Sequence, residues 1–341
     1  MAFEGAGNAS PQGGNMASTA VFRRALIAGC SALLLGGVIS AAAPQLKVQA
    51  PGYYRMMLGD FEITALSDGT NALPVSALLQ GVAAPEIGKL LAKSYLTEPV
   101  ETSFNGFLIN TGSKLVLIDT GAGKSMGPGT GHLLANLQAA GYRPEQVDEV
   151  YLTHFHGDHI GGLLSGEQRS FPNAVIRADS HEAGYWLDAE AMTTAPKDVR
   201  ERSEAAMAQL KPYIAAGQFK TFDSAAGGAQ GLLLVPGIRA LDTRGHTPGH
   251  TSYLIESSGA KLLVLGDLVH VAAVQFPRPA VGIRFDSDSK AAIAQRAKVF
   301  ADAAAHGYWI AAAHLSFPGI GHVQRSGASY NWVPANYGSR F

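Results

Sequence analysis

The sequence predicts an α/β (α+β) protein in which two mixed β-sheets pack face to face and helices cover their outer faces. Apolar, strand-like runs alternate with polar or helical segments, each half of the chain consists of strands followed by a helix, and there is no short-period repeat. With 341 residues, 47% of them hydrophobic and 16% charged, the chain is long and apolar enough to bury such a core. We expect residues 43–341 to form a single domain.

The first half of this domain begins with strands. Residues 53–69 (YYRMMLGDFEITALSDG) and 104–121 (FNGFLINTGSKLVLIDTG) carry aromatic and β-branched runs, and the segment NTGSK is typical of a hairpin turn. Residues 131–142 (GHLLANLQAAGY) have the apolar spacing of an amphipathic helix that ends at Gly141. A strand predicted at 149–154 (EVYLTH) then leads into a loop rich in histidine.

The second half repeats this order. A strand and a helix are predicted at 174–187 (AVIRADSHEAGYWL), and residues 188–220 have a helical composition. Residues 232–269 form a meander of short strands broken by Pro-Gly, Gly-His and Ser-Gly turns. A helix at 289–307 and a strand at 308–314 (YWIAAAH) complete the predicted domain.

Residues 1–42 have the composition of a signal peptide. Arg23 and Arg24 precede an apolar stretch at 25–43, and small residues near position 42 offer a cleavage site, so the mature chain would begin near Ala43 and be periplasmic or secreted. A membrane anchor, twin-arginine instead of Sec export, and lipidation at Cys30 are alternatives to ordinary cleavage and export. Stable membrane insertion of the mature chain is not expected.

Charge and cysteine content exclude several functions. The formal net charge is −1 and the chain has no run of lysine or arginine, so nucleic acid is not expected as a partner and a small-molecule substrate is. Cleavage after residue 42 would remove Glu4, Arg23, Arg24 and the single cysteine, leaving 24 basic and 26 acidic residues. A mature chain without thiols has no disulfides, and its metal sites must use His, Asp and Glu.

Histidines and aspartates gather after the predicted strands. The stretch VYLTHFHGDHIGG at 150–162 is followed by TRGHTPGH, VLGDLVH and AAAHLSFPG, each just after an apolar run. Together they supply nine candidate ligand side chains: His154, His156, Asp158, His159, His246, His250, Asp267, His270 and His314. Because loops at strand ends commonly carry functional residues, we expect these side chains to meet at one metal site.

At these motifs, and at APGYYRMMLGDFEITAL, SKLVLIDTG, DSDSK and HLSFPGIGH, the chain resembles the metallo-β-lactamase superfamily. The resemblance is greatest to methyl parathion hydrolases and their lactonase (dihydrocoumarin hydrolase-like) relatives, and it covers the whole mature chain. It implies an αββα sandwich, a homodimer and two divalent metal ions. One ion would bind His154, His156 and His246, the other would bind Asp158, His159 and His314, and the carboxylate of Asp267 would bridge them.

The chemistry of these ligands agrees with the resemblance. Imidazoles and carboxylates suit Zn²⁺, our first choice, and also Mn²⁺, Co²⁺ or Fe²⁺. Two such ions would share a hydroxide that attacks a carbonyl or phosphoryl centre, while Asp267 shuttles the proton to the leaving oxygen. Asp119 would orient a histidine ring, and His250 would have a supporting role instead of binding metal.

Departures from the family pattern bear on the substrate. The cysteine that class B β-lactamases commonly place at Asp267 is absent, as are the extra domain and basic surface of the nucleases. Lactonases carry a tyrosine donor where this chain has His270, whereas methyl parathion hydrolases have an apolar residue there and aromatic residues near Arg202 and Ser203. A hydrolase of lactones or aryl esters with side activity on organophosphate triesters is therefore predicted. The alternative prediction is a hydrolase whose main substrates are organophosphate triesters of the methyl parathion type.

Other interpretations stay open at this point. An iron protein that reduces oxygen or oxidises sulfur, or a metal-binding protein without catalysis, would share the scaffold, and His270 could simply face solvent. An apolar pocket is expected, with five candidate wall residues: Met126, Trp186, Phe276, Ile283 and Phe285. The remaining histidines that lack partners in the pattern are expected to be solvated or core residues: His132, His181, His306 and His322.

Overall fold

The computed structural model describes residues 43–338, and the chain from residue 49 onward forms a compact unit. The predicted signal peptide, residues 1–42, lies outside the described residues. None of the helices within residues 43–338 combines the length and apolarity needed to cross a bilayer.

The first sheet has seven strands, antiparallel at one side and parallel at the other. In spatial order they are β1 (Tyr53–Leu58), β2 (Phe61–Leu73), β4 (Val100–Asn110), β5 (Leu115–Ile118), β6 (Glu149–Tyr151), β9 (Val175–Asp179) and β10 (Phe219–Phe222). The predicted hairpin turn joins β4 to β5, where Asn110 accepts a hydrogen bond from the Gly112 N–H at 2.9 Å.

The second sheet also has seven strands, and only the pair β14 and β16 is parallel. Its spatial order is β11 (Leu232–Val235), β12 (Ile238–Asp242), β13 (Thr251–Ser257), β14 (Ala260–Val264), β16 (Trp309–Ala311), β17 (Ile320–Ser326) and β18 (Ser329–Pro334). The predicted meander corresponds to β11 through β14, and the predicted last strand corresponds to β16.

Both sheets are apolar on both faces. In β5, Val116 and Ile118 pack into a core shared with the second sheet, while Leu115 and Leu117 pack against helices on the other side. β14 does the same, with Leu263 on its outer face. Successive side chains of a strand point to opposite faces, so a strand buried on both sides must be continuously apolar. This explains why the central strands appear as apolar runs instead of an alternation.

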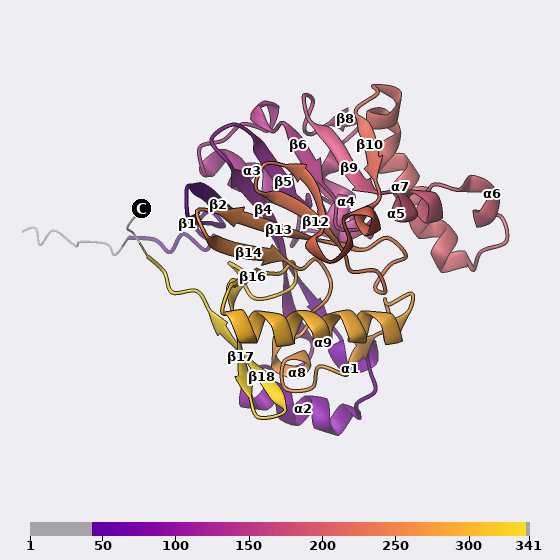
Figure 1. Cartoon of the computed structure of the whole chain (residues 1–341). Helices are drawn as coiled ribbons and strands as arrows, with labels where there is room; N and C mark the ends of the chain where they lie inside the picture. The colour runs from indigo at the N-terminus through magenta and orange to yellow at the C-terminus, as the bar shows by residue number, and fades with distance from the viewer. Residues whose placement is uncertain (1–42, 339–341) are drawn as a thin grey trace, which may run out of the picture. The chain divides into compact units, whose positions relative to one another are not determined.

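Helices cover the outer faces (Figure 1). α3 (Leu133–Ala139), α5 (Ser180–Trp186) and α7 (Lys197–Ala215) contribute to the core outside the first sheet. α9 (Ser289–His306) lies along the second sheet, begins at the capping side chain of Asp288, and ends at Gly307 with φ 66°. The two sheets with helices outside confirm the predicted fold class.

Smaller elements complete the described chain. They are α1 (Val75–Leu78), β3 (Leu79–Gln80), α2 (Ala84–Lys93), η1 (Pro144–Gln146), α4 (Gly157–Ile160), η2 (Gly161–Leu163), β7 (Leu164–Ser165), β8 (Gln168–Arg169), α6 (Ala189–Met192), η3 (Ser224–Gln230), α8 (Ala272–Gln275) and β15 (Gly282–Ile283). The segment expected to be wholly helical, 188–220, ends instead in β10, which pairs in parallel with β9. Such a four-residue strand depends on its neighbour and carries little local signal.

Candidate metal centre

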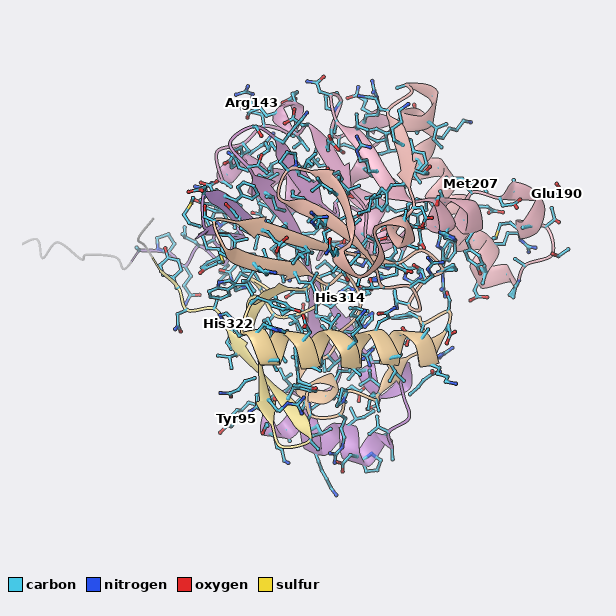
Figure 2. The ribbon with its side chains drawn as sticks, viewed as in Figure 1. Tyr95, Arg143, Glu190, Met207, His314 and His322 are labelled. Atoms are coloured by element: carbon cyan, nitrogen blue, oxygen red, sulfur yellow. The ribbon has the colours of Figure 1, made fainter. Side chains whose placement is uncertain are left out.

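Loops from both sheets meet at one edge of the sandwich. The loop after β6 carries His154 to His159, and the loops after β12, β14 and β16 carry His246, Asp267 and His314. Because β5 is parallel to β6 and β14 is parallel to β16, the carboxyl ends of these strands lie at the same edge of each sheet. Figure 2 shows His314 in the interior, whereas Arg143 and Glu190 lie at the periphery.

Three histidines and an aspartate form the first of two groups. The ligand atoms of His154, His156, His246 and Asp267 lie within 4.8 Å of one another. His246 Nε2 is 3.1 Å from His156 Nδ1 and 3.3 Å from Asp267 Oδ2. His154 Nε2 is 3.6 Å from the same Asp267 oxygen.

The second group shares Asp267 with the first. It contains Asp158, His159, Asp267 and His314, again with ligand atoms within 4.8 Å. His159 Nε2 and His314 Nε2 are each 3.1 Å from Asp267 Oδ1, and His314 Nε2 is 3.4 Å from Asp158 Oδ2. Asp267 Oδ2 thus faces the first group and Oδ1 faces the second, although His314 Nε2 is also 3.2 Å from Oδ2. All seven predicted ligands are brought together in the pairing that the resemblance implies.

These atoms fit metal ions better than hydrogen bonds. The buried atoms His154 Nε2, His159 Nε2 and Asp267 Oδ1 have no hydrogen-bond partner, and leaving such atoms unsatisfied is costly. Two ligands of a tetrahedral ion at about 2.0–2.1 Å are separated by about 3.3 Å. The spacing of 3.1 Å between the His246 and His156 nitrogens is close to that value. The donor set therefore supports divalent metal ions at this centre.

The outer nitrogens of the rings are held by other groups. His159 Nδ1 donates to Asp119 Oδ2 at 2.8 Å, His246 Nδ1 donates to Asp286 Oδ1 at 2.9 Å, and His314 Nδ1 donates to the Ser103 carbonyl at 3.2 Å. Each contact leaves Nε2 as the free nitrogen facing the centre, which fixes both tautomer and ring orientation. The expected contact between Asp119 and a histidine ring is present.

Asp286 was missed at the sequence level. It belongs to the DSDSK motif but lies 40 residues from His246, and nothing local indicates that the two side chains meet. Its Oδ2 also accepts from the Ile283 N–H at 3.1 Å. Asp119 is similarly anchored, because it accepts hydrogen bonds from the backbone and hydroxyl of Thr153, and its backbone has φ 58°. A non-glycine residue in this left-handed region is uncommon.

His250 is buried behind the centre instead of within either group. Its Nε2 accepts a hydrogen bond from the Asp267 N–H at 3.0 Å, and its Nδ1 lies 3.2 Å from the Thr243 carbonyl. Burial lowers the pKa of His250 to about 3, so the ring is neutral at physiological pH. Next to Asp267, Gly266 has φ 59°, and an added Cβ would lie 2.6 Å from His250 Nε2. His250 therefore positions the Asp267 backbone.

Proton occupancy in the metal-free chain differs among the ligands. Burial lowers the pKa values of His154 and His156 well below their ordinary value. Although burial opposes it, hydrogen bonds to Asp267 and Asp286 raise the pKa of His246 to about 9. Burial likewise opposes ionisation of Asp267, but the charges of the surrounding histidines lower its pKa. Metal ions entering at neutral pH must therefore displace at least one proton.

His270 borders the centre without belonging to either group of ligands. Its Nε2 lies 3.2 Å from Asp267 Oδ2, its Nδ1 has no partner, and its ring stacks on His314 with centroids 5.1 Å apart. Burial lowers the pKa of His270 to about 4. A neutral imidazole has one N–H, which can serve Asp267 or a substrate but not both at once.

A cavity of ≈ 220 Å³ opens beside the centre. Its lining consists of Leu73, Phe104, Met126, His156, Gly157, Asp158, Arg202, Asp267, His270, Phe285 and His314. Two of the five predicted wall residues, Met126 and Phe285, are among them. Apolar side chains and a few convergent polar groups are typical of small-molecule sites.

The other three predicted wall residues lie elsewhere. Phe276 is buried between Phe300 and Trp332, at centroid distances of 4.6 and 5.4 Å. Ile283 is packed in the cluster around α2 and β15. Trp186 is 2% exposed and places its ring edge against His156, at 5.7 Å, so it lies behind a predicted ligand instead of lining the cavity. Loop position alone did not distinguish wall from core.

The remaining histidines do not reach the centre. His181 contacts Asp179, His306 contacts Asp302, and His322 packs on Trp309. His132 precedes α3. This agrees with their expected roles outside the site.

Comparison with known proteins places this geometry in a family. The model of the metallo-beta-lactamase superfamily matches residues 103–305. An N-acyl homoserine lactonase of Bacillus cereus is 30% identical over 131 residues, which cover 38% of this chain and 41% of that protein. The chain thus matches about two fifths of the length of this curated relative.

Two solved structures match over most of their length. The hydrolase AbOPH of the beta lactamase superfamily is 39% identical, with a TM-score of 0.80 over 86% of this chain and 100% of that one. AidC, a dizinc quorum-quenching lactonase solved with a product, is 27% identical, with a TM-score of 0.76 over 84% and 99%. The family model covers more than half of the chain, and the fold agrees with it, so this protein belongs to the metallo-beta-lactamase superfamily.

Proposed function

We propose that the protein is a binuclear metal-dependent hydrolase that uses two Zn²⁺ ions to open lactones or aryl esters, with weaker activity on organophosphate triesters. The observation that carries the proposal is the pair of ligand groups joined by Asp267, whose buried nitrogen and oxygen atoms lack other partners. The similarity to an N-acyl homoserine lactonase and to the lactonase AidC supports lactones as the substrate class.

The ions, Asp267 and the apolar lining would have different roles in the reaction. Bound ions would supply an activated water and would polarise the oxygen of the attacked group. Asp267 would hold the ions at a fixed separation and carry a proton toward the leaving oxygen. Leu73, Phe104, Met126 and Phe285 would bind the apolar body of the substrate and exclude water from the reacting centre.

The geometry of His270 favours a second candidate. Its Nε2 is 3.2 Å from Asp267 Oδ2, so the donor that a lactone carbonyl would use already faces a carboxylate. A phosphotriester does not require that donor. The alternative function is therefore a hydrolase whose main substrates are organophosphate triesters of the methyl parathion type.

A hydrolysis panel tests both candidates. Protein reconstituted with Zn²⁺ is compared on lactones, aryl esters, phosphotriesters and β-lactams at matched metal content. We expect the largest kcat/KM on lactones or aryl esters and none on β-lactams. A larger kcat/KM on phosphotriesters selects the alternative. If the protein hydrolyses none of these substrates, the proposed function is overturned.

The cellular setting belongs to the same proposal. Residues 1–42 would be removed on export, leaving a periplasmic or secreted domain of residues 43–341 that assembles as a homodimer. Intact-mass measurement of protein from the native cell envelope tests the cleavage, and sedimentation of the purified chain tests the dimer. A species that keeps residues 25–42 and requires detergent would establish a membrane anchor instead.

A further inference from the structure

Glu182 is a fully buried carboxylate that the proposed chemistry does not use. It lies in the first turn of α5, is 0% exposed, and belongs to neither ligand group. Burial raises its pKa, although hydrogen bonds from neighbouring N–H groups act in the opposite direction. Burying a carboxyl group costs free energy unless its oxygens accept hydrogen bonds.

The contacts of Glu182 join the two histidine-bearing loops. Its Oε1 accepts from the Phe155 N–H at 2.8 Å, and Phe155 stands between His154 and His156. Its Oε2 accepts from the Gly249 N–H at 2.9 Å, in the loop that carries His246. One carboxylate therefore connects the loop that follows β6 of the first sheet to the loop that follows β12 of the second sheet.

Close packing shows that this connection is built into the fold. A Cβ added to Gly249 would lie 2.1 Å from the Glu182 backbone nitrogen and 2.6 Å from its Cβ, so only glycine permits the approach. Glu182 Oε1 also accepts from Trp186 Nε1 at 2.7 Å, and the Trp186 ring packs edge-on against His156. The carboxylate thus supports His156 by two routes.

We propose that Glu182 is a positioning residue of the metal centre: it sets the spacing of His154, His156 and His246, and therefore the affinity for the ion of that first group. The inference rests on the binuclear centre of the proposed function. Asp119 has the corresponding task in the second group through His159. Groups that orient metal ligands typically change metal affinity by about 10–100-fold when they are replaced.

The variant Glu182→Gln tests the proposal while preserving side-chain size. An amide has one acceptor oxygen, so its NH₂ group must face an N–H donor from one of the two loops. We expect one of the two Zn²⁺ ions to bind about 10–100-fold more weakly in competition with a chelator. Glu190→Gln removes the same charge at an exposed position and is the matched control; it should bind both ions as the wild type does.

The identity of the weakened ion follows from combining variants. If Glu182 and Asp119 act on different ions, Glu182→Gln and Asp119→Asn each weaken the binding of one ion. At a chelator concentration that leaves one ion in each single variant, the double variant should lose both ions. Retention of one ion in the double variant, equal weakening of both ions in Glu182→Gln, or wild-type binding in Glu182→Gln overturns the proposal. Wild-type protein with fewer than two sites overturns the binuclear function as well.

A second variant guards against misfolding. Glu182→Asp keeps the charge but is one methylene shorter, so it cannot reach both loops. Circular dichroism checks the fold of each variant, and cobalt(II) absorption reports the coordination of the first group. A folded Glu182→Asp variant with an unchanged cobalt(II) spectrum and unchanged affinities contradicts the proposed role.

A separate observation concerns Arg202, the one lysine or arginine among the residues that line the cavity beside the centre. It also lines a neighbouring hollow of ≈ 330 Å³ together with Ser125, Phe155 and Gln209. Its side chain is 41% exposed, and its one ion pair among the described residues is with the exposed Asp198, at 3.3 Å. An exposed ion pair of this kind contributes little to the free energy of folding. The guanidinium has five N–H donors, so it can also bind a ligand.

From this placement we infer that Arg202 determines specificity: it binds a carboxylate on the remote end of an ester or lactone substrate. The inference rests on the proposed hydrolase function. The other walls of the cavity are apolar apart from the centre itself, so Arg202 is the group there suited to recognise an anion. Lys197, on the same helix, is 81% exposed and outside both cavities, which makes it a matched control.

Two phenyl esters test this inference, one of butyric acid and one of glutaric acid with a free carboxylate. Arg202→Gln should lower kcat/KM on the glutarate ester at least tenfold, mainly through KM, and change the butyrate value less than threefold, as expected for one charged pair of about 1.4 kcal/mol or more. Lys197→Gln should leave both values unchanged. Equal losses on both esters, or the same loss in Lys197→Gln, overturn the assignment.

Failure of the hydrolase function is separable from this result. If the wild type hydrolyses neither ester, calorimetric binding of the anilide of glutaric acid still tests Arg202. Binding that is equal in wild type and Arg202→Gln overturns the inference, and a tenfold weaker binding in the variant supports it.

Discussion

Three groups of histidine and aspartate in the described chain meet the same distance condition, yet the two central groups differ in kind from the third. The central groups are buried and present nitrogen and oxygen atoms without partners. The third group, called the surface group below, consists of Asp179, His181 and Asp223, of which His181 and Asp223 are exposed. There, Asp179 accepts from the His181 backbone and ring, at 2.7 and 2.9 Å, and from Ser224 at 2.9 and 2.6 Å.

The difference shows that residue type and proximity do not make a metal site. Asp179 and Asp223 cap the starts of α5 and η3, so both oxygens of Asp179 and one oxygen of Asp223 already accept hydrogen bonds. In the centre, the outer ring nitrogens of His159 and His246 are bound to Asp119 and Asp286, and their inner nitrogens face the other ligand atoms. A site needs ligand atoms that the protein itself leaves unsatisfied.

The largest effect expected is from Asp267→Ala, which removes the only carboxylate shared by the two central groups. We expect the variant to lose both metal ions and all measurable hydrolysis, because five histidines would then face one another without the shared anion. Metal analysis of the purified protein measures this. A fully active variant with one ion or none would remove the basis of the binuclear model.

The pH dependence of metal binding gives the next largest effect. The folded pKa of His246 is raised to about 9 from an ordinary 6.5, so protonated His246 stabilises the metal-free chain fully below pH 6.5, and this stabilisation is lost as pH rises through 9. A metal ion must displace that proton. We expect Zn²⁺ affinity to fall roughly tenfold per pH unit between pH 9 and 7, about 100-fold in all.

Calorimetry in buffers with different ionisation enthalpies measures the proton released. Zn²⁺ binding without proton release at pH 7 would contradict the proton occupancy inferred for His246.

Asp119→Asn addresses the outer contacts that distinguish the centre from the surface group. The amide keeps the size of the carboxylate but no longer provides the charge that holds His159 Nδ1–H. We expect about 10–100-fold weaker binding of one ion. Asp188→Asn, a change at an exposed helix cap, is the control and should bind metal normally. Equal affinities in the two variants would show that His159 needs no orienting partner.

His270→Leu separates the two candidate substrate classes. Loss of an oxyanion donor typically costs about 10²–10³ in turnover, and the metal ions would absorb part of this, so we expect at least a tenfold loss on lactones. Phosphotriester turnover should hold or rise because the apolar wall is enlarged. Both are measured at matched metal content. A parallel fall in the two activities would assign His270 to support of the metal site, and unchanged lactone hydrolysis would remove His270 as a reason to prefer a lactone substrate.

The smallest effect is expected at the surface group. His181→Ala and Asp223→Asn should leave metal content and hydrolysis unchanged, because their partners are protein groups and solvent. Metal analysis of either variant checks this. Loss of an ion there would mean that the protein binds metal at a site whose own hydrogen bonds are complete.

The sequence alone predicted the fold class and nine candidate ligand side chains, because both have local signatures. A strand buried on both faces is a continuous apolar run, as in β5 and β14, and the histidine motifs directly follow such runs. Resemblance then supplied the pairing of the ligands. The predicted signal peptide, homodimer and substrate class stay predictions.

Only the tertiary structure decided which groups support these ligands and which residues line the cavity. Glu182 and Gly249, or His246 and Asp286, are far apart along the chain, and their contacts depend on how α5 and the loops of two sheets pack together. Phe276 and Phe285 are both apolar loop residues, but one is enclosed by Phe300 and the other faces the cavity. Local sequence specifies chemistry and periodicity, whereas packing between distant elements determines which side of a side chain remains open to a ligand.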